Sequence, residues 1–366
     1  MSGINSDLVT VDRFVTHVST VPATFGRTVG LFVREKVRAD VLATAQQHRP
    51  PVVLMVHGGF APPTVAYDLG YRDYSFMAVL ARAGYDVFTM AHTGYAPSPR
   101  PLMDDPCNVD AEFQHLLTPH VLARPLPPRY PHKLVSSRTE WDELETVIDW
   151  ICKRRGVERV SLIGWSTGAP RAGGYAALHP DRVDRLILFG AAPYFPSDDA
   201  PATMPEPGAP TLLQTREFLL QRRWQDHVRC EGQLEDDAVC EAMWREIMAL
   251  DEVGSTWAAD GRGIMRAPNR MNFGWRANLA RIQAPTLMLL GEFDNYAKRL
   301  EAWRGLGAPQ KLFIRVACAS HFMQFERGRH LLYRATADWL AAATVDGYAR
   351  GELAADERGR LVASPA

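Results

Sequence analysis

The chain has 366 residues, of which 46% are hydrophobic and 23% charged, and its formal net charge is −1. This length allows one large α/β domain with an insertion, or two domains. Because the charges nearly cancel and no block of like charge stands out, we expect neither nucleic acid nor a membrane surface as a partner. No stretch approaches the ~20 apolar residues of a membrane-spanning helix.

Strand and helix patterns alternate in the first part of the chain. Two alternating, β-branched runs within residues 8–37 predict an antiparallel strand pair. Residues 51–56 and 85–90 predict buried strands on either side of a helix over 75–83. A long, proline-rich excursion then occupies residues 95–132, which is longer than a usual connection between elements.

The alternation continues after the excursion. Ser137 and Glu140 indicate a capping box at the start of a helix over 137–155. Four further buried strands are predicted at 160–163, 186–189, 286–290 and 312–316. Helical segments fall between or after most of these strands. The chain therefore predicts an α/β fold: a doubly wound, mostly parallel sheet of eight strands.

Two stretches break this rhythm and suggest a division of the chain. Residues 193–283 read as a helical cap, with helices around 212–228 and 238–250, inserted into a core formed by 1–192 and 284–342. The tail, residues 343–366, is small, polar and charged. Its composition fits either partial disorder or late packing onto the fold.

The five cysteines and the first residues bear on the compartment. Residues 1–11 lack the basic and apolar regions of a secretion signal. The cysteines are scattered and lack metal-ligand spacing: Cys107, Cys152, Cys230, Cys240 and Cys318. We therefore expect free thiols in a reducing cytoplasm, with a pair between Cys230 and Cys240 only if the protein is exported.

The most informative motif is Gly-Trp-Ser-Thr-Gly, residues 164–168, between the strand at 160–163 and a helical segment at 169–178. In a nucleophile elbow, a sharp turn between strand and helix exposes a serine hydroxyl. Gly164 and Gly168 supply the flanking positions without side chains that such a strained turn needs. The hydroxyl of Ser166 would stand above a helix N-terminus, whose dipole favours negative charge.

A serine nucleophile needs a base, and the base needs an orienting carboxylate. Asp294 follows the strand at 286–290, and His321 follows the next strand. This is the order Ser, acid, His found in doubly wound hydrolases. Other acids remain as alternatives to Asp294, namely Glu292, Asp198 and Asp199.

On these residues the chain resembles the α/β-hydrolase superfamily, from about residue 11 to about residue 340. The resemblance implies that Ser166 is the nucleophile, that His321 is the general base and then the general acid, and that Asp294 holds His321. It implies no cofactor and no metal.

The segment His57-Gly58-Gly59-Phe60, after a strand, resembles the oxyanion motif of the same superfamily. The resemblance implies that the backbone N–H groups of Gly59 and Thr167 form the oxyanion hole. We expect His57 to organise this loop through hydrogen bonds.

The sequence also departs from the family. The segment 91–98 has Ala91 and Ala96 where the family often has Asp and a second Gly, so the closer subfamily stays open. Ser166 stands where haloalkane dehalogenases and epoxide hydrolases carry Asp, which disfavours those activities.

The leading function is hydrolysis of a carboxylic ester or lactone of a hydrophobic small molecule. Amide or peptide cleavage, carbon–carbon bond hydrolysis, acyl transfer and a hydrolase-like ligand receptor remain alternatives. Apolar and aromatic residues are expected to bind the substrate, namely Phe60, Trp165, Tyr194, Trp224 and Trp244. A homodimer is compatible with the sequence.

Overall fold

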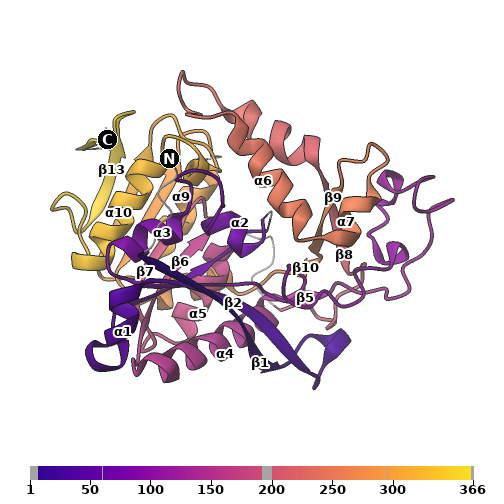
Figure 1. Cartoon of the computed structure of the whole chain (residues 1–366), viewed down its shortest axis with the longest axis horizontal. Coiled ribbons are helices and arrows are strands. Elements are labelled where there is room, and N and C mark those ends of the chain that lie inside the picture. Colours follow the sequence, from indigo (N-terminus) through magenta and orange to yellow (C-terminus); the bar gives the residue numbers. More distant parts are fainter. Residues whose placement is uncertain (1–6, 60, 192–199, 295, 364–366) are drawn as a thin grey trace.

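The computed structural model describes residues 7–363 except 60, 192–199 and 295. Its centre is a ten-stranded sheet in the order β1-β2-β4-β3-β6-β7-β11-β12-β13-β14 (Figure 1). The strands are β1 (Leu8–Val18), β2 (Thr28–Arg38), β3 (Val52–Val56), β4 (Asp86–Met90), β6 (Val160–Trp165), β7 (Val183–Phe189), β11 (Thr286–Gly291), β12 (Lys311–Val316), β13 (Gly351–Ala355) and β14 (Leu361–Ala363). Neighbours from β4 to β13 are parallel. The pairs β1–β2, β2–β4 and β13–β14 are antiparallel.

The eight strands predicted from the sequence are all present, and the tail adds the remaining two. β13 pairs in parallel with β12, and β14 folds back on β13. Leu353 and Ala355 of β13 are buried against the core, which explains why this polar tail is ordered. The described part of the sheet therefore has ten strands instead of the eight predicted.

Helices cover both faces of the sheet and divide the core into two clusters. One face carries α3 (Phe76–Arg82) and α10 (Arg329–Ala342). The other carries α4 (Ser137–Arg155), α5 (Gly168–Leu178) and α9 (Tyr296–Gly305). Two shorter helices lie near the first strands, α1 (Ala39–His48) and α2 (Pro63–Tyr67). In the described part of the chain, no helix combines the length and the hydropathy needed to cross a membrane.

The helix predicted over 137–155 is confirmed, but its capping box begins one residue earlier. The Ser136 side chain accepts from the N–H of Thr139, and the Thr139 side chain accepts from the N–H of Ser136. Ser137 instead accepts a hydrogen bond from the N–H of Phe273, and Glu140 is engaged by buried arginines. Ser137 and Glu140, which the local pattern assigned to the cap, therefore make tertiary contacts instead.

Residues 200–283, which we call the insertion, lie between β7 and β11. They contain β8 (Thr211–Thr215), a π-helix (Glu217–Arg222), α6 (Ala238–Ala249), α7 (Glu252–Trp257), β9 (Ile264–Pro268), β10 (Arg270–Met271) and α8 (Trp275–Asn278). The helix predicted around 238–250 is confirmed. The helix predicted over 212–228 is wrong at its start, because β8 pairs with β9 there.

The proline-rich excursion packs on the insertion, on the right of Figure 1. The N–H of Asp110 donates to the backbone O of Thr211 at 2.9 Å, and β5 (Val135–Ser136) pairs with β10. A separate hydrophobic cluster joins the two segments, formed by Cys107, Val109, Leu117, Leu122, Leu213, Trp257 and Ile264. The excursion and the insertion thus share one core, although about 100 residues separate them in the sequence.

Candidate active site

The turn after β6 has the backbone conformation that the motif predicts. Ser166 has a positive φ of +56°, which is unfavourable for a residue with a Cβ. A Cβ added to Gly168 would lie 2.0 Å from the backbone O of Val56, and one added to Gly164 would lie 2.5 Å from the backbone O of Gly168. Both positions therefore require glycine, because the neighbouring backbone lies too close for a side chain.

The structure brings Ser166, His321 and Asp294 together at the carboxyl ends of β6, β12 and β11. The Oγ of Ser166 lies 3.0 Å from Nε2 of His321. On the other side of the ring, Nδ1 of His321 lies 3.0 Å from Oδ2 and 3.1 Å from Oδ1 of Asp294. All three side chains are buried. This is the geometry by which a carboxylate orients an imidazole toward a serine hydroxyl.

Glu292, the nearest alternative acid, has other partners. One of its carboxylate oxygens accepts from Arg315 at 2.8 Å, and the other accepts from the N–H of Cys318 at 3.1 Å. The remaining alternatives, Asp198 and Asp199, lie outside the described residues. Asp294 is thus the predicted acid that the structure places against His321.

A glycine that the sequence analysis did not single out makes room for the His–Asp pair. Gly190 follows β7 with a positive φ of +49°. A Cβ at this position would lie 3.2 Å from Nδ1 of His321 and 3.3 Å from Oδ2 of Asp294. A glycine directly after a buried strand is the only local signal that could have indicated it.

Gly59 and Thr167, the two residues predicted for the oxyanion hole, face each other. The register of β3 against β6 pairs Val56 with Gly164, so the loop after β3 lies beside Ser166. A Cβ added to Gly59 would lie 3.4 Å from Oγ1 of Thr167. Thr167 is the N-cap residue of α5, where backbone N–H groups favour an anion. Phe60 lies outside the described residues.

A buried charge cluster fixes the backbone of this loop. Arg171 of α5 donates to the backbone O of His57 at 2.8 Å and to Glu140 at 2.6 Å. The other oxygen of Glu140 accepts from Arg270. Burial alone would raise the pKa of Glu140, but the two guanidinium groups lower it to about 2. Arg171 and Arg270 were not predicted from the sequence, and Glu140 was predicted as part of a helix cap.

Two buried histidines complete the support of the loop. Nδ1 of His57 donates to the backbone O of Gly58 at 2.7 Å, and its Nε2 accepts from the N–H of His92 at 3.4 Å. Nδ1 of His92 lies 2.8 Å from Glu143. Burial lowers the pKa of both histidines. His57 therefore makes the hydrogen bonds within the loop that the sequence analysis expected of it.

The tryptophans predicted to bind substrate have protein partners for their N–H groups. Trp165 is fully buried and donates to the backbone O of His321 at 3.0 Å. Trp224 donates to Glu326 at 3.0 Å, and Trp244 donates to the backbone O of Arg262 at 2.8 Å. Tyr194 lies outside the described residues. Contact of these side chains with a substrate stays a prediction.

The prediction of five free thiols is wrong. Cys230 and Cys318 form a disulfide with a sequence separation of 88 residues, whereas Cys107, Cys152 and Cys240 are free and buried. The folded chain brings Cys230 of the insertion to the loop before His321, a contact that cysteine spacing does not reveal. With a disulfide present, the cysteines no longer indicate a reducing compartment.

One group of potential metal ligands comes together in the described residues, namely Cys230, Cys318 and Glu357. Because two of these three residues are joined in the disulfide, they offer no thiolates to a metal ion.

The fold agrees with comparisons against known proteins. Residues 51–328 match the family model described as alpha/beta hydrolase fold. This match covers more than half of the chain, which therefore belongs to the α/β-hydrolase fold family. No curated protein matches the chain.

Solved structures share the fold at low sequence identity. A serine hydrolase involved in carbazole degradation has a TM-score of 0.52 and 18% identity, with 91% of this chain and 99% of that chain covered. A meta-cleavage product hydrolase from Pseudomonas fluorescens IP01 has a TM-score of 0.53 and 13% identity, with 90% and 98% covered. These likenesses concern the fold alone.

Proposed function

We propose that this chain is a serine hydrolase that cleaves a carboxylic ester or lactone of a hydrophobic small molecule. One observation carries the proposal. The hydroxyl of Ser166 lies 3.0 Å from Nε2 of His321, whose Nδ1 lies 3.0 Å from Asp294. A serine, a base within hydrogen-bond reach and an acid that orients the base are the requirements for nucleophilic acyl transfer.

In the proposed reaction, Oγ of Ser166 attacks the substrate carbonyl while Nε2 of His321 takes its proton. The carbonyl oxygen becomes an oxyanion, which accepts hydrogen bonds from the backbone N–H groups of Gly59 and Thr167. His321 then gives its proton to the leaving alkoxide, and the alcohol departs. Water attacks the acyl-enzyme with His321 as base again, which frees the acid and restores Ser166.

We further propose that the insertion acts as a cap over this site. It lies between β7 and β11, and the segments that follow these two strands carry Gly190 and Asp294, which lie beside His321. Trp224 of the insertion stacks on Phe322, with ring centroids 4.9 Å apart. An aromatic, water-poor cover of this kind favours an uncharged substrate.

Carbon–carbon bond hydrolysis of a β-diketone-type substrate is the second candidate. The support for it is the meta-cleavage product hydrolase among the solved structures with this fold. The same three residues would serve both reactions, so the bond cleaved must be determined with substrates. Amide cleavage, acyl transfer and a receptor role use the same site and are outcomes of the same experiment.

A fluorophosphonate probe tests the proposal, because it reacts with activated serines. Stoichiometric labelling of Ser166, mapped by mass spectrometry and lost in Ser166→Ala, is expected. Turnover is then measured on esters, lactones, amides and β-diketones. Steady multiple turnover contradicts the receptor role, and strong competition of added alcohols or hydroxylamine with water favours acyl transfer. Absence of labelling in the folded protein would overturn the proposed function.

A further inference from the structure

The loop that carries His321 is attached to the insertion at several points. We call residues 318–327 the histidine loop and residues 224–233 the insertion arm. The disulfide between Cys230 and Cys318 joins the two segments at one end. At the other end, the N–H of Arg327 donates to the backbone O of Gln233 at 2.8 Å. The insertion arm therefore spans the length of the histidine loop.

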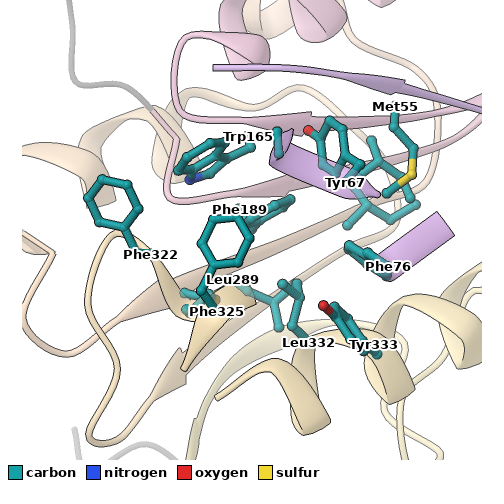
Figure 2. Close-up of a cluster of buried hydrophobic side chains, with 14 of the residues drawn as sticks. Met55, Tyr67, Phe76, Trp165, Phe189, Leu289, Phe322, Phe325, Leu332 and Tyr333 are labelled. Atoms are coloured by element: carbon teal, nitrogen blue, oxygen red, sulfur yellow. The ribbon is translucent and has the colours of Figure 1, made fainter. Parts of the chain in front are cut away.

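Aromatic contacts of Trp224 form a third attachment between the insertion arm and the histidine loop. The Trp224 indole lies parallel to the ring of Phe322, with centroids 4.9 Å apart and an angle of 17° between the planes. The ring of Phe325 also packs against Trp224, with ring centroids 5.6 Å apart. Figure 2 shows Phe322 and Phe325 beside Trp165, the residue before the serine. Trp224 of the insertion arm thus contacts two aromatic side chains of the histidine loop.

Glu326 links Trp224 of the insertion arm to Ser320, the residue before His321. Its carboxylate is fully buried and accepts hydrogen bonds from the N–H of Ser320 at 2.8 Å and from the Ser320 hydroxyl. The Trp224 indole N–H is the third donor, at 3.0 Å. A buried carboxylate is costly unless donors surround it, and these three donors come from the residue before His321 and from the insertion arm.

The residue before His321 and the peptide group after it are both held by hydrogen bonds. Ser320, held by Glu326, also accepts from the N–H of Phe322 at 3.2 Å through its hydroxyl. From the core side, the Trp165 indole donates to the backbone O of His321 at 3.0 Å. Trp165 therefore holds the backbone O of His321, and the insertion, through Trp224 and Glu326, holds the residue before His321.

We propose that Glu326 and Trp224 are positioning residues, through which the seated insertion holds His321 at hydrogen-bond distance from Ser166. The inference rests on the proposed function, because it assigns a role to residues that act through its general base. General-base catalysis depends on ring placement within a fraction of an ångström, and a misplacement of about 1 Å can cost about 100-fold in rate. Loss of either positioning residue should therefore lower kcat and the reactivity of Ser166.

Trp224→Phe tests the proposal. The substitution keeps an aromatic ring to stack on Phe322, removes the N–H donor to Glu326, and leaves a small cavity because Trp224 is fully buried. Trp303→Phe is the matched control. Trp303 also donates to a glutamate, Glu352, at 2.9 Å, but it belongs to the hydrophobic cluster on the opposite face of the sheet.

We expect Trp224→Phe to lower kcat on a responsive ester by about tenfold or more, to leave KM within about threefold, and to slow fluorophosphonate labelling of Ser166 in parallel. Trp303→Phe should keep both rates within about twofold of wild type. Equal rates in the two variants would overturn the proposal. A change in KM alone would also overturn it, because Trp224 would then contact the substrate instead of positioning the base.

If Trp224→Phe does not fold, Ser320→Ala carries the same test, because it removes the hydroxyl that Glu326 accepts from and leaves no large cavity. The two hypotheses fail in different ways. A wild-type protein that is neither labelled nor active overturns the proposed function, and the positioning role with it. A labelled, active wild type whose Trp224→Phe and Ser320→Ala variants react at the wild-type rate overturns the positioning role alone.

Discussion

Replacing Glu140 with Gln should destabilise the protein because it leaves two buried guanidinium groups with too little negative charge. Glu140 accepts from Arg171 through one oxygen and from Arg270 through the other. All three side chains are less than a tenth exposed. Glutamine is similar in size, but its amide NH₂ would face a donor of one arginine. One hydrogen bond is lost and a buried charge is left uncompensated.

The size of the loss follows from the pKa of Glu140. The pKa falls from 4.5 to about 2 in the fold, and each unit corresponds to about 1.4 kcal/mol. The carboxylate therefore contributes about 3 kcal/mol at neutral pH, in agreement with the roughly 3–5 kcal/mol measured on breaking buried ion pairs. With an unfolding entropy of about 2 cal/mol/K per residue, a chain of this length should lose about 4 °C in Tm.

The dependence on pH distinguishes charge from packing. Because the folded-state pKa of Glu140 is lowered, its contribution is complete above the unfolded value of 4.5 and is lost as the pH falls toward 2. The gap in Tm between wild type and Glu140→Gln should be full at pH 7 and less than half as large at pH 3. Thermal unfolding followed by circular dichroism at both pH values measures it.

Glu145→Gln is the control, because Glu145 lies on the same helix and is exposed. It should change Tm by no more than about 1 °C. The reasoning would be refuted by a Glu140→Gln variant that melts within 1 °C of wild type at pH 7, or by a gap that is equal at pH 7 and pH 3.

Three further predictions concern the site and its surroundings. Asp294→Asn should lower kcat by about 10⁴-fold with an unchanged circular dichroism spectrum, because the imidazole loses its orienting acceptor; a mild effect would assign the acid to another residue. Gly190→Ala should lower both Tm and kcat, since its φ of +49° is strained for alanine and a Cβ 3.2 Å from Nδ1 of His321 would press on the imidazole, and wild-type values in melting and ester assays would contradict this. Removing the disulfide by Cys230→Ser with Cys318→Ser, or by a reductant, should lower stability by up to about 5 kcal/mol for a loop of this length. Titration of unreduced, unfolded wild type should find three thiols, and five would refute the bond.

The fold was largely predictable because its strands carry local signals. Buried parallel strands read as continuous apolar runs, and the six such segments in the sequence, with the two alternating runs before them, are all strands of the sheet. The strands that were missed depend on distant partners. β8 is a strand because it pairs with β9, about 50 residues later, and β13 is a strand because β12 offers it an edge.

The three residues brought together at the site were predictable for a related reason. Ser166, Asp294 and His321 each come three to five residues after a predicted strand. In a parallel sheet the carboxyl ends of the strands lie at one edge, so the chain order of these residues indicates that they meet there. The oxyanion loop after β3 follows the same rule, and its register against β6 places it beside the serine.

The residues that hold this site in place were missed because nothing local distinguishes them. Glu140, Arg171 and Arg270 are each an ordinary charged residue in the sequence, and only the fold brings them together from α4, α5 and the insertion. Glu326 lies five residues after His321, yet its buried environment depends on Trp224, 102 residues away. The reacting residues directly follow strands, so the sequence pattern predicts their positions. Groups that fix them act through long-range contacts, and their substitution should therefore affect stability and rate together, whereas substitution of the reacting groups should affect rate alone.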